Sequence, residues 1–549
     1  MIMKKFLFVL VAVVCAAQVA DACTNFLVGK KASADGSVFV SYSADSFGMS
    51  GFLAHYPASV NPEGTMRPIY DWDTGKYLGS IPEAPVTYNV IGNINEHQVA
   101  IAETTFGGRH ELADSTGIID YGSLIYIALQ RSKSAREAIE VMTTLTQEYG
   151  YYSEGESFSI ADPNEVWILE MIGKGSEKGT VWVAVRIPDD CIAAHANQAR
   201  IHKFDMKDKE NVMYSKDVIK FARKKGYFSG KDEDFSFAMA YCPPDFGGLR
   251  WCDARAWSFF NMYADADMNE YLAWASGDVT ATPMPLYFKP KKQLTLQDVQ
   301  AAMRDHFEGT PFAVNEDLGG GIYNMPYRLP PLTFKYDGKE YFNERPISTF
   351  QSAFTFVAQM RSHLPNEIGG VLWFGCDDAN MIVYTPVYCC LDRVPACYSA
   401  ANADPVTFSW DSSFWVFNWV SNMIYPKYSL VEPDLMRVRG DIEKRIYDAS
   451  QELEAQFAAS LKDAPKYALA AIKDFSCNSA EEVLREWKKF GEYIIVKYND
   501  LVVKPEENGR FKRTSTGIGA TVVRPGYPEA YKKRLIEETG DKYLLPLSK

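Results

Sequence analysis

The sequence predicts an α+β fold in which helices cover layered β-sheets. Between residues 24 and 186, strand-like runs come first, helix-like runs follow, and strand-like runs return. Separate blocks of this kind favour an α+β fold over a repeated βαβ unit. The chain has 549 residues, of which 47% are hydrophobic and 14% aromatic, so it can bury a substantial core.

The first block predicts two β-hairpins. Each consists of two short β-prone runs around a polar turn, at residues 33–37 in the first and 95–98 in the second. The runs are Thr24–Val28, Val38–Ser41, Tyr88–Ile94 and Val99–Thr105. Residues 61–85 are rich in Pro, Gly, Asp and Tyr without a clear period, and we interpret them as a long loop that walls a cleft.

Helices follow this block, and strands follow the helices. The spacing of apolar residues predicts helices over Tyr121–Gln130 and Ser134–Tyr149. Ser134 and Glu137 have the spacing of a capping box at the start of the second helix. Further strands are predicted at Ser157–Ile160, Val166–Met171 and Val181–Arg186.

The second half of the chain is more mixed and ends in helices. Leu296–His306 is predicted as a helix capped by Thr295, and Phe350–Arg361 also has a helical pattern. Strands are predicted at Val371–Phe374 and Met381–Thr385. From Leu435 to Val496 the sequence becomes rich in Glu, Lys, Arg and Ala, which indicates two or three helices. We therefore expect a mostly helical C-terminal extension over residues 431–549.

The N-terminus has the features of a secretory signal peptide. Lys4 and Lys5 precede the apolar run Phe6–Ala17, and Ala20 and Ala22 form an A-x-A cleavage site. Cleavage would remove residues 1–22 and leave Cys23 as the first residue. The sequence thus predicts an exported protein, periplasmic or extracellular.

An N-terminal cysteine carries a thiol and a free α-amine on one residue. The amine, with an ordinary pKa of about 8, can take the proton of the thiol and so act as its base. Two other interpretations stay open: Cys23 as a half-cystine, and Cys23 as a lipidated residue, although Asp21 and Ala20 fit a lipoprotein signal poorly.

Several segments resemble peptidase family C69, whose members are N-terminal-nucleophile hydrolases. In chain order they are residues 23–38 (CTNFLVGKKASADGSV), Ala44–Ser46, Ala102–Thr105, Ala196–Ile201, Phe307–Phe312 and Leu372–Gly375. Secernins, penicillin V acylases and bile salt hydrolases are more distant relatives. The resemblance implies a four-layer αββα sandwich over residues 23–430 and the activity of a cysteine-type dipeptidase, working through a thioester on Cys23 and without a metal or organic cofactor.

The catalytic residues that the resemblance implies are Cys23, Asp45 and Asn197. The second strand of the first hairpin can bring Asp45 beside residue 23, where its carboxylate would orient the amine. Asn197 would donate to the oxyanion. Relatives commonly carry an Arg where this chain has Tyr42. Either another cation, such as Arg200 or Arg345, takes its place, or the substrate preference and the pKa of the thiol differ from those of the relatives.

A dipeptidase must recognise a free amine, a free carboxylate, or both. Glu103, near the end of the predicted strand Val99–Thr105, and Arg109 close by are the candidates for these contacts, with Arg200 as a further substrate-binding residue. Solvated surface charge is the ordinary explanation for such residues. We expect a small peptide as substrate and leave the oligomeric state open, with a homo-oligomer as one option.

Composition and motifs argue against several other functions. The net charge of −13 and the lack of basic clusters argue against nucleic acid as a partner. The histidines form no H-x-x-x-H or H-E-x-x-H pattern, and beyond the signal no apolar stretch has the length of a membrane span. Of the ten cysteines, Cys15 would leave with the signal peptide, and the eight that remain besides Cys23 permit up to four disulfides. The alternatives to a dipeptidase are a non-peptide amide hydrolase of the acylase or bile salt hydrolase type, and a non-enzymatic cell-surface binding protein.

Overall fold

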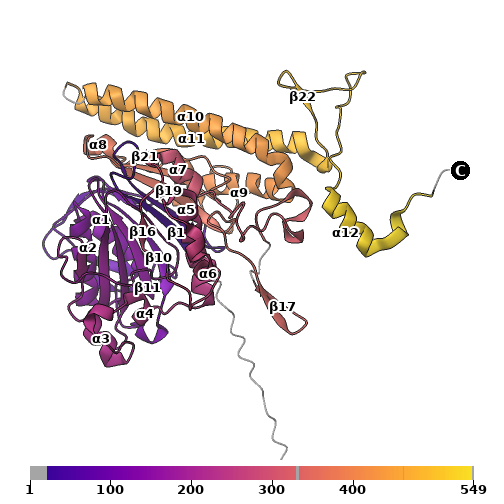
Figure 1. Ribbon diagram of the computed structural model, residues 1–549. Helices are drawn as coiled ribbons and strands as arrows, with labels where there is room; N and C mark the ends of the chain where they lie inside the picture. The colour runs from indigo at the N-terminus through magenta and orange to yellow at the C-terminus, as the bar shows by residue number, and fades with distance from the viewer. Residues whose placement is uncertain (1–21, 329–332, 461–462, 547–549) are drawn as a thin grey trace, which may run out of the picture.

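The computed structural model describes residues 22–328, 333–460 and 463–546, and two large antiparallel sheets lie at its centre (Figure 1). The expected signal peptide falls outside the described residues, except for Ala22. The fold is a mixed α+β fold with long C-terminal helices, which agrees with the predicted class.

The first sheet contains the N-terminal strand. In spatial order its strands are β16 (Tyr287–Phe288), β14 (Ile192–His195), β1 (Ala22–Val28), β2 (Val38–Asp45), β19 (Ser352–Met360), β20 (Val371–Cys376) and β21 (Thr385–Tyr388). β1 pairs with β2 on one side and with β14 on the other. The start of the described chain is therefore an interior strand.

The second sheet is formed mostly by the middle of the chain. Its strands, in spatial order, are β15 (Val212–Tyr214), β13 (Thr180–Ile187), β12 (Val166–Gly173), β11 (Gly155–Ala161), β10 (Ala100–Gly107), β9 (Ile94–Asn95), β8 (Val90–Ile91) and β3 (His55–Tyr56). The described residues also form small two-stranded pairs. These are β4 (Ser59–Val60) with β7 (Val86–Thr87), β5 (Met66–Tyr70) with β6 (Tyr77–Pro82), β17 (Thr333–Tyr336) with β18 (Lys339–Phe342), and β22 (Glu506–Glu507) with β23 (Arg510–Phe511).

A buried histidine links the two sheets. His195 of β14 has its Nδ1 atom 2.7 Å from Thr104 Oγ1 of β10 and its Nε2 atom 2.8 Å from Ser159 Oγ of β11. Burial, with a smaller contribution from the Arg200 charge, lowers the pKa of His195 to about 3. The imidazole is therefore neutral, and it joins the sheets by hydrogen bonds without burying a charge.

Helices cover the outer faces of the sheets. α1 (Tyr121–Arg131) and α2 (Ala135–Tyr149) share an apolar cluster with Phe158 and Leu169 of the second sheet. α5 (Ala254–Tyr263) packs on the first sheet, where Phe259 stacks on Phe26 with ring centroids 4.2 Å apart. The other helices of this region are α3 (Val218–Lys225), α4 (Phe237–Tyr241), α6 (Leu272–Ala275), α7 (Leu296–Ala302) and α8 (Asn366–Gly369).

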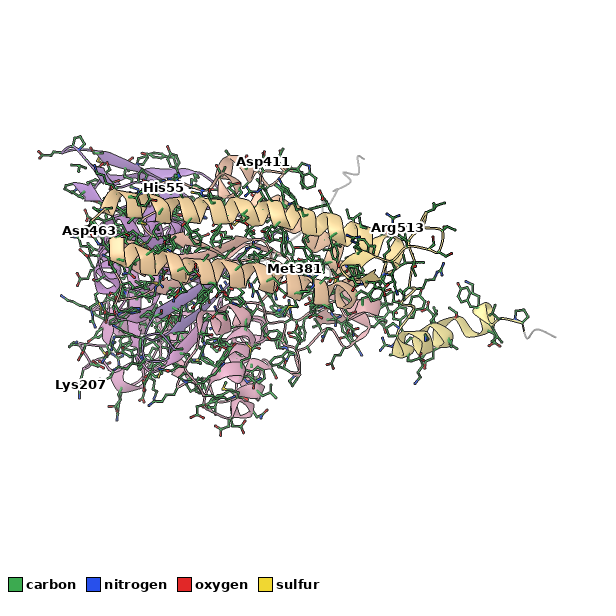
Figure 2. All side chains as sticks on the ribbon, turned by 90° about the horizontal axis from the view of Figure 1, so that it is seen from above. His55, Lys207, Met381, Asp411, Asp463 and Arg513 are labelled. Carbon is green, nitrogen blue, oxygen red and sulfur yellow. The ribbon has the colours of Figure 1, made fainter. Side chains whose placement is uncertain are left out.

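The C-terminal helices lie along the first sheet. α9 (Ser413–Ile424) leads into α10 (Tyr428–Ser460) and α11 (Pro465–Tyr498), a long pair that runs side by side across the molecule (Figures 1 and 2). The backbone N–H of Tyr388 in β21 donates to Ser476 Oγ of α11 at 3.3 Å. α12 (Glu529–Thr539) buries none of its residues and lies at one end of the pair (Figure 1).

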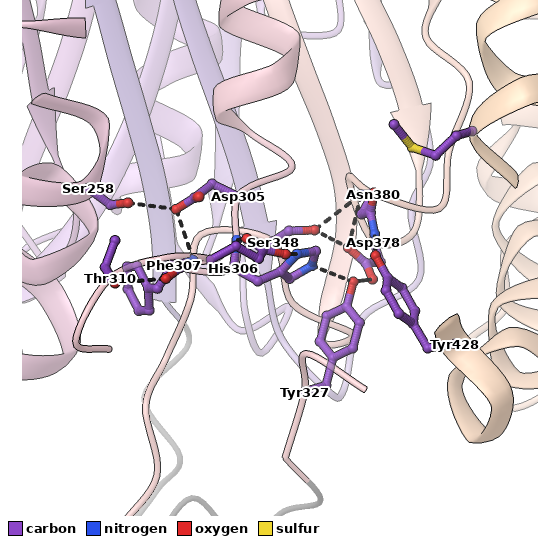
Figure 3. Close-up of polar contacts among 12 residues, drawn as sticks. Ser258, Asp305, His306, Phe307, Thr310, Tyr327, Ser348, Asp378, Asn380 and Tyr428 are labelled. Atoms are coloured by element: carbon purple, nitrogen blue, oxygen red, sulfur yellow. Dashed lines mark hydrogen bonds and ion pairs between the residues drawn. The ribbon is translucent and has the colours of Figure 1, made fainter. Parts of the chain in front are cut away.

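One segment that resembles family C69, Phe307–Phe312, begins beside a largely buried polar network around His306 (Figure 3). His306 is 2.8 Å from both Glu308 Oε1 and the Tyr327 hydroxyl, and that hydroxyl donates to Asp378. Asn380 continues the network by donating to the Tyr428 hydroxyl of α10 at 2.8 Å. This network therefore joins the sheet region to the C-terminal helices.

Most predicted elements are confirmed, and three predictions differ from the structure. Phe350–Arg361 is not a helix, because β19 occupies Ser352–Met360 between β2 and β20 and is buried on both faces. Residues 61–85 are not simply a loop, since β5 and β6 pair within them. The strand predicted at Met381–Thr385 begins only at Thr385. The helices predicted within Leu435–Val496 are confirmed as two, α10 and α11, in the described part of that range.

The described residues contain neither disulfides nor a membrane-spanning candidate. Every cysteine in the described ranges is a free thiol, so the disulfides that the sequence permits are not formed. None of the described helices combines the length and the apolar character needed to cross a bilayer.

A buried ion pair fastens α10 to the first sheet and gives a first testable prediction. Arg361 donates to both carboxylate oxygens of Glu454 at 2.7 Å, and the Tyr388 hydroxyl donates to the same carboxylate at 2.7 Å. We expect Glu454→Ala to lower the free energy of unfolding by about 3–5 kcal/mol, because it leaves the Arg361 charge buried without a partner. The matched control Asp448→Ala, which breaks the exposed Lys444–Asp448 pair, should cost less than about 1 kcal/mol. Equal losses in urea unfolding would contradict this assignment.

Candidate active site

Cys23 lies near the start of β1 and is 7% exposed. Its backbone is opposite Ala44 of β2 in the strand register. The Sγ atom is 3.6 Å from the Tyr42 hydroxyl and 3.6 Å from Glu103 Oε1. Burial first, and then the Glu103 and Asp45 carboxylates, raise the pKa of the Cys23 thiol well above its ordinary value. The thiol is therefore protonated at rest and needs a base to become a nucleophile.

The backbone nitrogen of Cys23 is held by Asn197. It donates to Asn197 Oδ1 at 2.8 Å, and Asn197 Nδ2 donates to the Thr105 carbonyl at 2.8 Å. Asn197 follows β14 with a φ of +57°, a left-handed conformation that Asn adopts more readily than most residues. In the full-length chain this nitrogen is an amide; a cut after Ala22 would turn it into an α-amine in the same place.

Arg255 of α5 is the main residue of this site that the sequence does not reveal. Its Nη1 atom donates to the Cys23 carbonyl and to Thr24 Oγ1, each at 2.8 Å, and its Nη2 atom donates to Asn197 Oδ1 at 3.0 Å. Arg255 is fully buried. It lies more than 230 residues from Cys23 in the chain, in a helical segment without any motif, so only the packing of α5 on β1 brings it here.

Asp45 lies at the end of β2 and lines the same cavity as Cys23, but it does not bind the Cys23 nitrogen. Its carboxylate accepts from Ser352 Oγ at 2.6 Å and from Arg345 Nη2 at 3.3 Å. Burial raises the pKa of Asp45, and the Arg345 charge opposes that rise. The sequence predicts Asp45 as the group that orients the amine; in the structure Asn197 makes that contact.

The structure also shows which cations accompany Tyr42. Arg345 pairs with Asp45, and Arg255 binds the backbone of Cys23. Arg200 lies elsewhere: it is buried with its Nε atom 3.1 Å from Asp253 Oδ1. Arg200 thus belongs to a structural ion pair and does not line the Cys23 cavity, whereas Arg345 lies close to the site as the sequence suggests.

Glu103 belongs to a pair of buried carboxyl groups. It is 3% exposed, and the Tyr42 hydroxyl donates to its Oε1 atom at 2.6 Å. Burial raises its pKa to about 7, although hydrogen bonds from Tyr42 and Glu156 oppose the rise. Burial and the Glu103 charge raise the pKa of Glu156 much further. Near neutral pH the protonated Glu156 therefore donates to Glu103.

A small cavity of about 50 Å³ opens at the thiol. Glu103 and aromatic side chains line it, among them Trp72 from the β5–β6 hairpin and Tyr121 and Tyr126 from α1. The expectation that residues 61–85 wall a cleft is met by Trp72. A buried carboxylate among aromatic rings is an environment suited to an ammonium group.

Arg109 lies in a different cavity, of about 430 Å³, which Asn197 also lines. Its Nε atom donates to the Ala240 carbonyl at 2.6 Å, and its guanidinium lies 3.9 Å from the centre of the Tyr227 ring. The structure therefore does not bring Arg109 into contact with Glu103. Glu103 lines the cavity at Cys23, and Arg109 lines the cavity at Asn197.

The site has no constellation for a bound metal ion in the described residues. Across the described ranges, no group of three or more His, Cys, Asp or Glu side chains is arranged to hold a cation. The functional groups of the site are one thiol, one backbone nitrogen, carboxyl groups and two buried arginines.

Comparison with known proteins identifies the class to which this thiol site belongs. The sequence profile of peptidase family C69 matches residues 22–440. The chain therefore belongs to peptidase family C69, a family of cysteine-type dipeptidases. The matched region begins one residue before Cys23 and ends within α10.

The curated relatives carry names that agree with this family. The chain is 26% identical over 413 residues to a "Probable dipeptidase" of Salmonella dublin, and the alignment covers 70% of this chain and 85% of that protein. It is 26% identical over 467 residues to a "Probable dipeptidase A" of Streptococcus pyogenes serotype M3, covering 80% and 90%. A "Dipeptidase" of Bifidobacterium longum is 25% identical over 425 residues, covering 68% and 72%.

Ionisation of Glu103 in the buried carboxyl pair is expected to lower the free energy of unfolding, and this can be tested. The pKa of Glu103 rises from its ordinary 4.5 to about 7 on folding, so the folded state holds this proton more tightly than the unfolded state. The contribution of protonated Glu103 to stability is complete below pH 4.5 and is lost as the pH rises through 7. Glu103→Gln cannot ionise, and we expect it to be more stable than the parent by about 2–3 kcal/mol at pH 8 and by little at pH 5.

Thermal and urea unfolding at both pH values check this expectation. The control is Glu63→Gln, at an exposed position, which should show no such pH-dependent gain. If Glu103→Gln and Glu63→Gln behave alike from pH 5 to pH 8, Glu103 does not carry a raised pKa in the folded protein.

Proposed function

We propose that this protein is exported, loses residues 1–22, and hydrolyses dipeptides with Cys23 as an N-terminal nucleophile. One observation carries the proposal. The nitrogen that would become the α-amine donates a hydrogen bond to Asn197 Oδ1 at 2.8 Å, while the thiol of the same residue lines a cavity beside Glu103. The four-layer αββα sandwich of N-terminal-nucleophile hydrolases is the architecture that we propose for the layers of helix and sheet around this residue. Helices α1 and α2 on one sheet and α5 on the other support it.

The first chemical step requires a base, because the thiol is protonated at rest. The α-amine of Cys23 takes the Sγ proton, and the thiolate attacks the carbonyl carbon of the substrate to form a C–S bond. The resulting ammonium returns the proton to the departing amine as the C–N bond breaks. Water then attacks the thioester carbonyl while the α-amine takes a proton from that water. The C–S bond breaks, the ammonium returns the proton to Sγ, and the N-terminal residue of the substrate leaves as a free acid.

Asn197 and Arg255 position this reacting residue. Asn197 Oδ1 accepts hydrogen bonds from the Cys23 nitrogen and from Arg255. Because the Cys23 nitrogen donates in this bond, its lone pair in the processed enzyme is free to accept the thiol proton. Asn197 Nδ2 has two hydrogens, of which one is used by the Thr105 carbonyl. We assign its second hydrogen, together with a backbone N–H, to the oxyanion that forms during attack. Asp45 then acts on the site through Arg345 and Ser352 and not through a bond to the amine.

The two ends of a dipeptide match the two cavities. Glu103 and the aromatic walls of the small cavity suit the ammonium group, on the side of the thiol. Arg109 lies beyond Asn197 in the other cavity and suits the carboxylate. We therefore propose that a dipeptide lies across Asn197, with its amine towards Glu103 and its carboxylate towards Arg109.

Processing at Cys23 gives the main test of this mechanism. We expect the mass of the exported protein to begin at an unmodified Cys23, and Cys23→Ala to lose dipeptide turnover by about 10³-fold or more. An added residue before Cys23 should abolish turnover too, because the amine then lies one residue away from the thiol.

The outcomes separate the competing interpretations. Full activity in the extended variant would disprove the role of the α-amine, and a lipidated or disulfide-bonded Cys23 would favour a binding protein. Cys397→Ala removes another buried thiol that lies outside the Cys23 cavity and is the control for loss of a cysteine as such.

Recognition of the amine gives a second test, based on the pKa of Glu103. We expect kcat/KM to be higher for a dipeptide than for its N-acetyl analogue, and Glu103→Gln to reduce that ratio by about tenfold or more. In the parent enzyme the ratio should fall as the pH falls below about 7, because Glu103 gains a proton and loses the charge that binds ammonium. A ratio that is independent of both pH and Glu103→Gln would show that Glu103 does not bind the amine.

A further inference from the structure

An apolar groove of about 790 Å³ adjoins the cavity at the thiol. The two hollows share Ser46 and Met49, which lie just after β2 and Asp45. None of the described residues that line the groove is charged. Its walls are mostly apolar and include Phe350 from the approach to β19 and Trp415 from α9. The groove is therefore a continuation of the site with a different chemical character.

The groove is held open by rigid surroundings. Tyr425 donates to Asp378 Oδ2 at 3.1 Å, and its ring lies 6.0 Å from that of Phe350. The Tyr327 ring packs against both, at 5.6 Å from Phe350 and 5.0 Å from Tyr425. Tyr327 and Asp378 belong to the buried network of His306 (Figure 3). This wall does not need to rearrange to receive a ligand, which lowers the entropic cost of binding.

We infer that this groove binds the side chain of the N-terminal residue of the substrate and selects a large apolar or aromatic one. The inference rests on the proposed function. The acyl half of a dipeptide is the half whose carbonyl meets Sγ and whose amine meets Glu103, so its side chain leaves from the cavity that opens into the groove. The cavity of Arg109, where the other half would lie, shares no lining residue with the groove.

The chemistry of the lining sets the preference. A charged side chain would lose water in the groove without gaining an opposite charge, whereas an aromatic side chain would gain apolar contact. A single hydrophobic pocket discriminates between side chains by roughly 10- to 200-fold in kcat/KM. We therefore expect Phe-Gly to exceed Ala-Gly by at least about tenfold, and Phe-Gly to exceed Gly-Phe as well.

Variants in α9 test the groove directly. Trp415→Ala removes an aromatic wall, and Asn422→Asp adds a charge without a change of size. Both should lower kcat/KM for Phe-Gly by about tenfold, mainly through KM, and change Ala-Gly by less than about twofold. Asn261→Asp, at an exposed position of α5, is the matched control and should change neither substrate. Equal losses for Phe-Gly and Ala-Gly, or a parent enzyme without preference for Phe-Gly, would overturn the inference.

Binding to an inactive variant separates this inference from the mechanism. In calorimetry with Cys23→Ala, Phe-Gly should bind about tenfold more tightly than Ala-Gly, and Asn422→Asp in that background should remove the difference. This result stands whether or not the α-amine is the base. If both peptides bind equally while the parent enzyme cleaves dipeptides, the groove inference fails and the proposed function survives. If the groove variants change only the oligomeric state in sedimentation, the groove is an interface between copies, and the inference is wrong.

Discussion

The position of β1 in the interior of the first sheet is the constraint on which the rest of the site depends. The strands β2 and β14 pair with the two edges of β1, which holds Cys23 in place near the start of that strand. Neighbouring side chains on β1 alternate between faces, so Phe26 and Thr24 meet α5 while Cys23 meets Tyr42 and Glu103. A shift of the register by one residue would turn the thiol towards α5 and away from the cavity.

The site concentrates charge where water is largely absent. Two arginines and three carboxyl groups lie within a few side chains of one thiol, and each is buried. Such an arrangement costs stability unless every charge is paired or neutralised by a proton. The structure uses both means: Arg345 pairs with Asp45, while Glu156 keeps its proton beside Glu103. The neutral His195 nearby joins the two sheets without adding a further charge.

Local patterns in the sequence predict the elements, and distant packing decides the partners. Cys23 is recognisable from a cleavage motif, and the hairpin that returns Asp45 to it is recognisable from its turn. By contrast, Arg255 reaches the site from a motif-free helix, so no local signal predicts it. The segment 61–85 is recognisable as a cleft wall, but nothing in its sequence singles out Trp72. β19 was predicted as a helix because a central strand that is buried on both faces lacks the alternation of an exposed strand. The contact between Asn197 and the Cys23 nitrogen depends on the left-handed backbone at Asn197, which spacing alone does not reveal.

The long helix pair has a consequence for how this protein behaves among its neighbours. β21 is the last strand of the first sheet, and an open strand of this kind exposes N–H and C=O groups that can template pairing with another chain. α11 lies against it, and Ser476 supplies an acceptor to the Tyr388 amide. Arg361 and Glu454 fix α10 over the same strand. The helices that follow the sheet therefore protect its open edge, which makes them a safeguard against edge-to-edge aggregation as well as a part of the core.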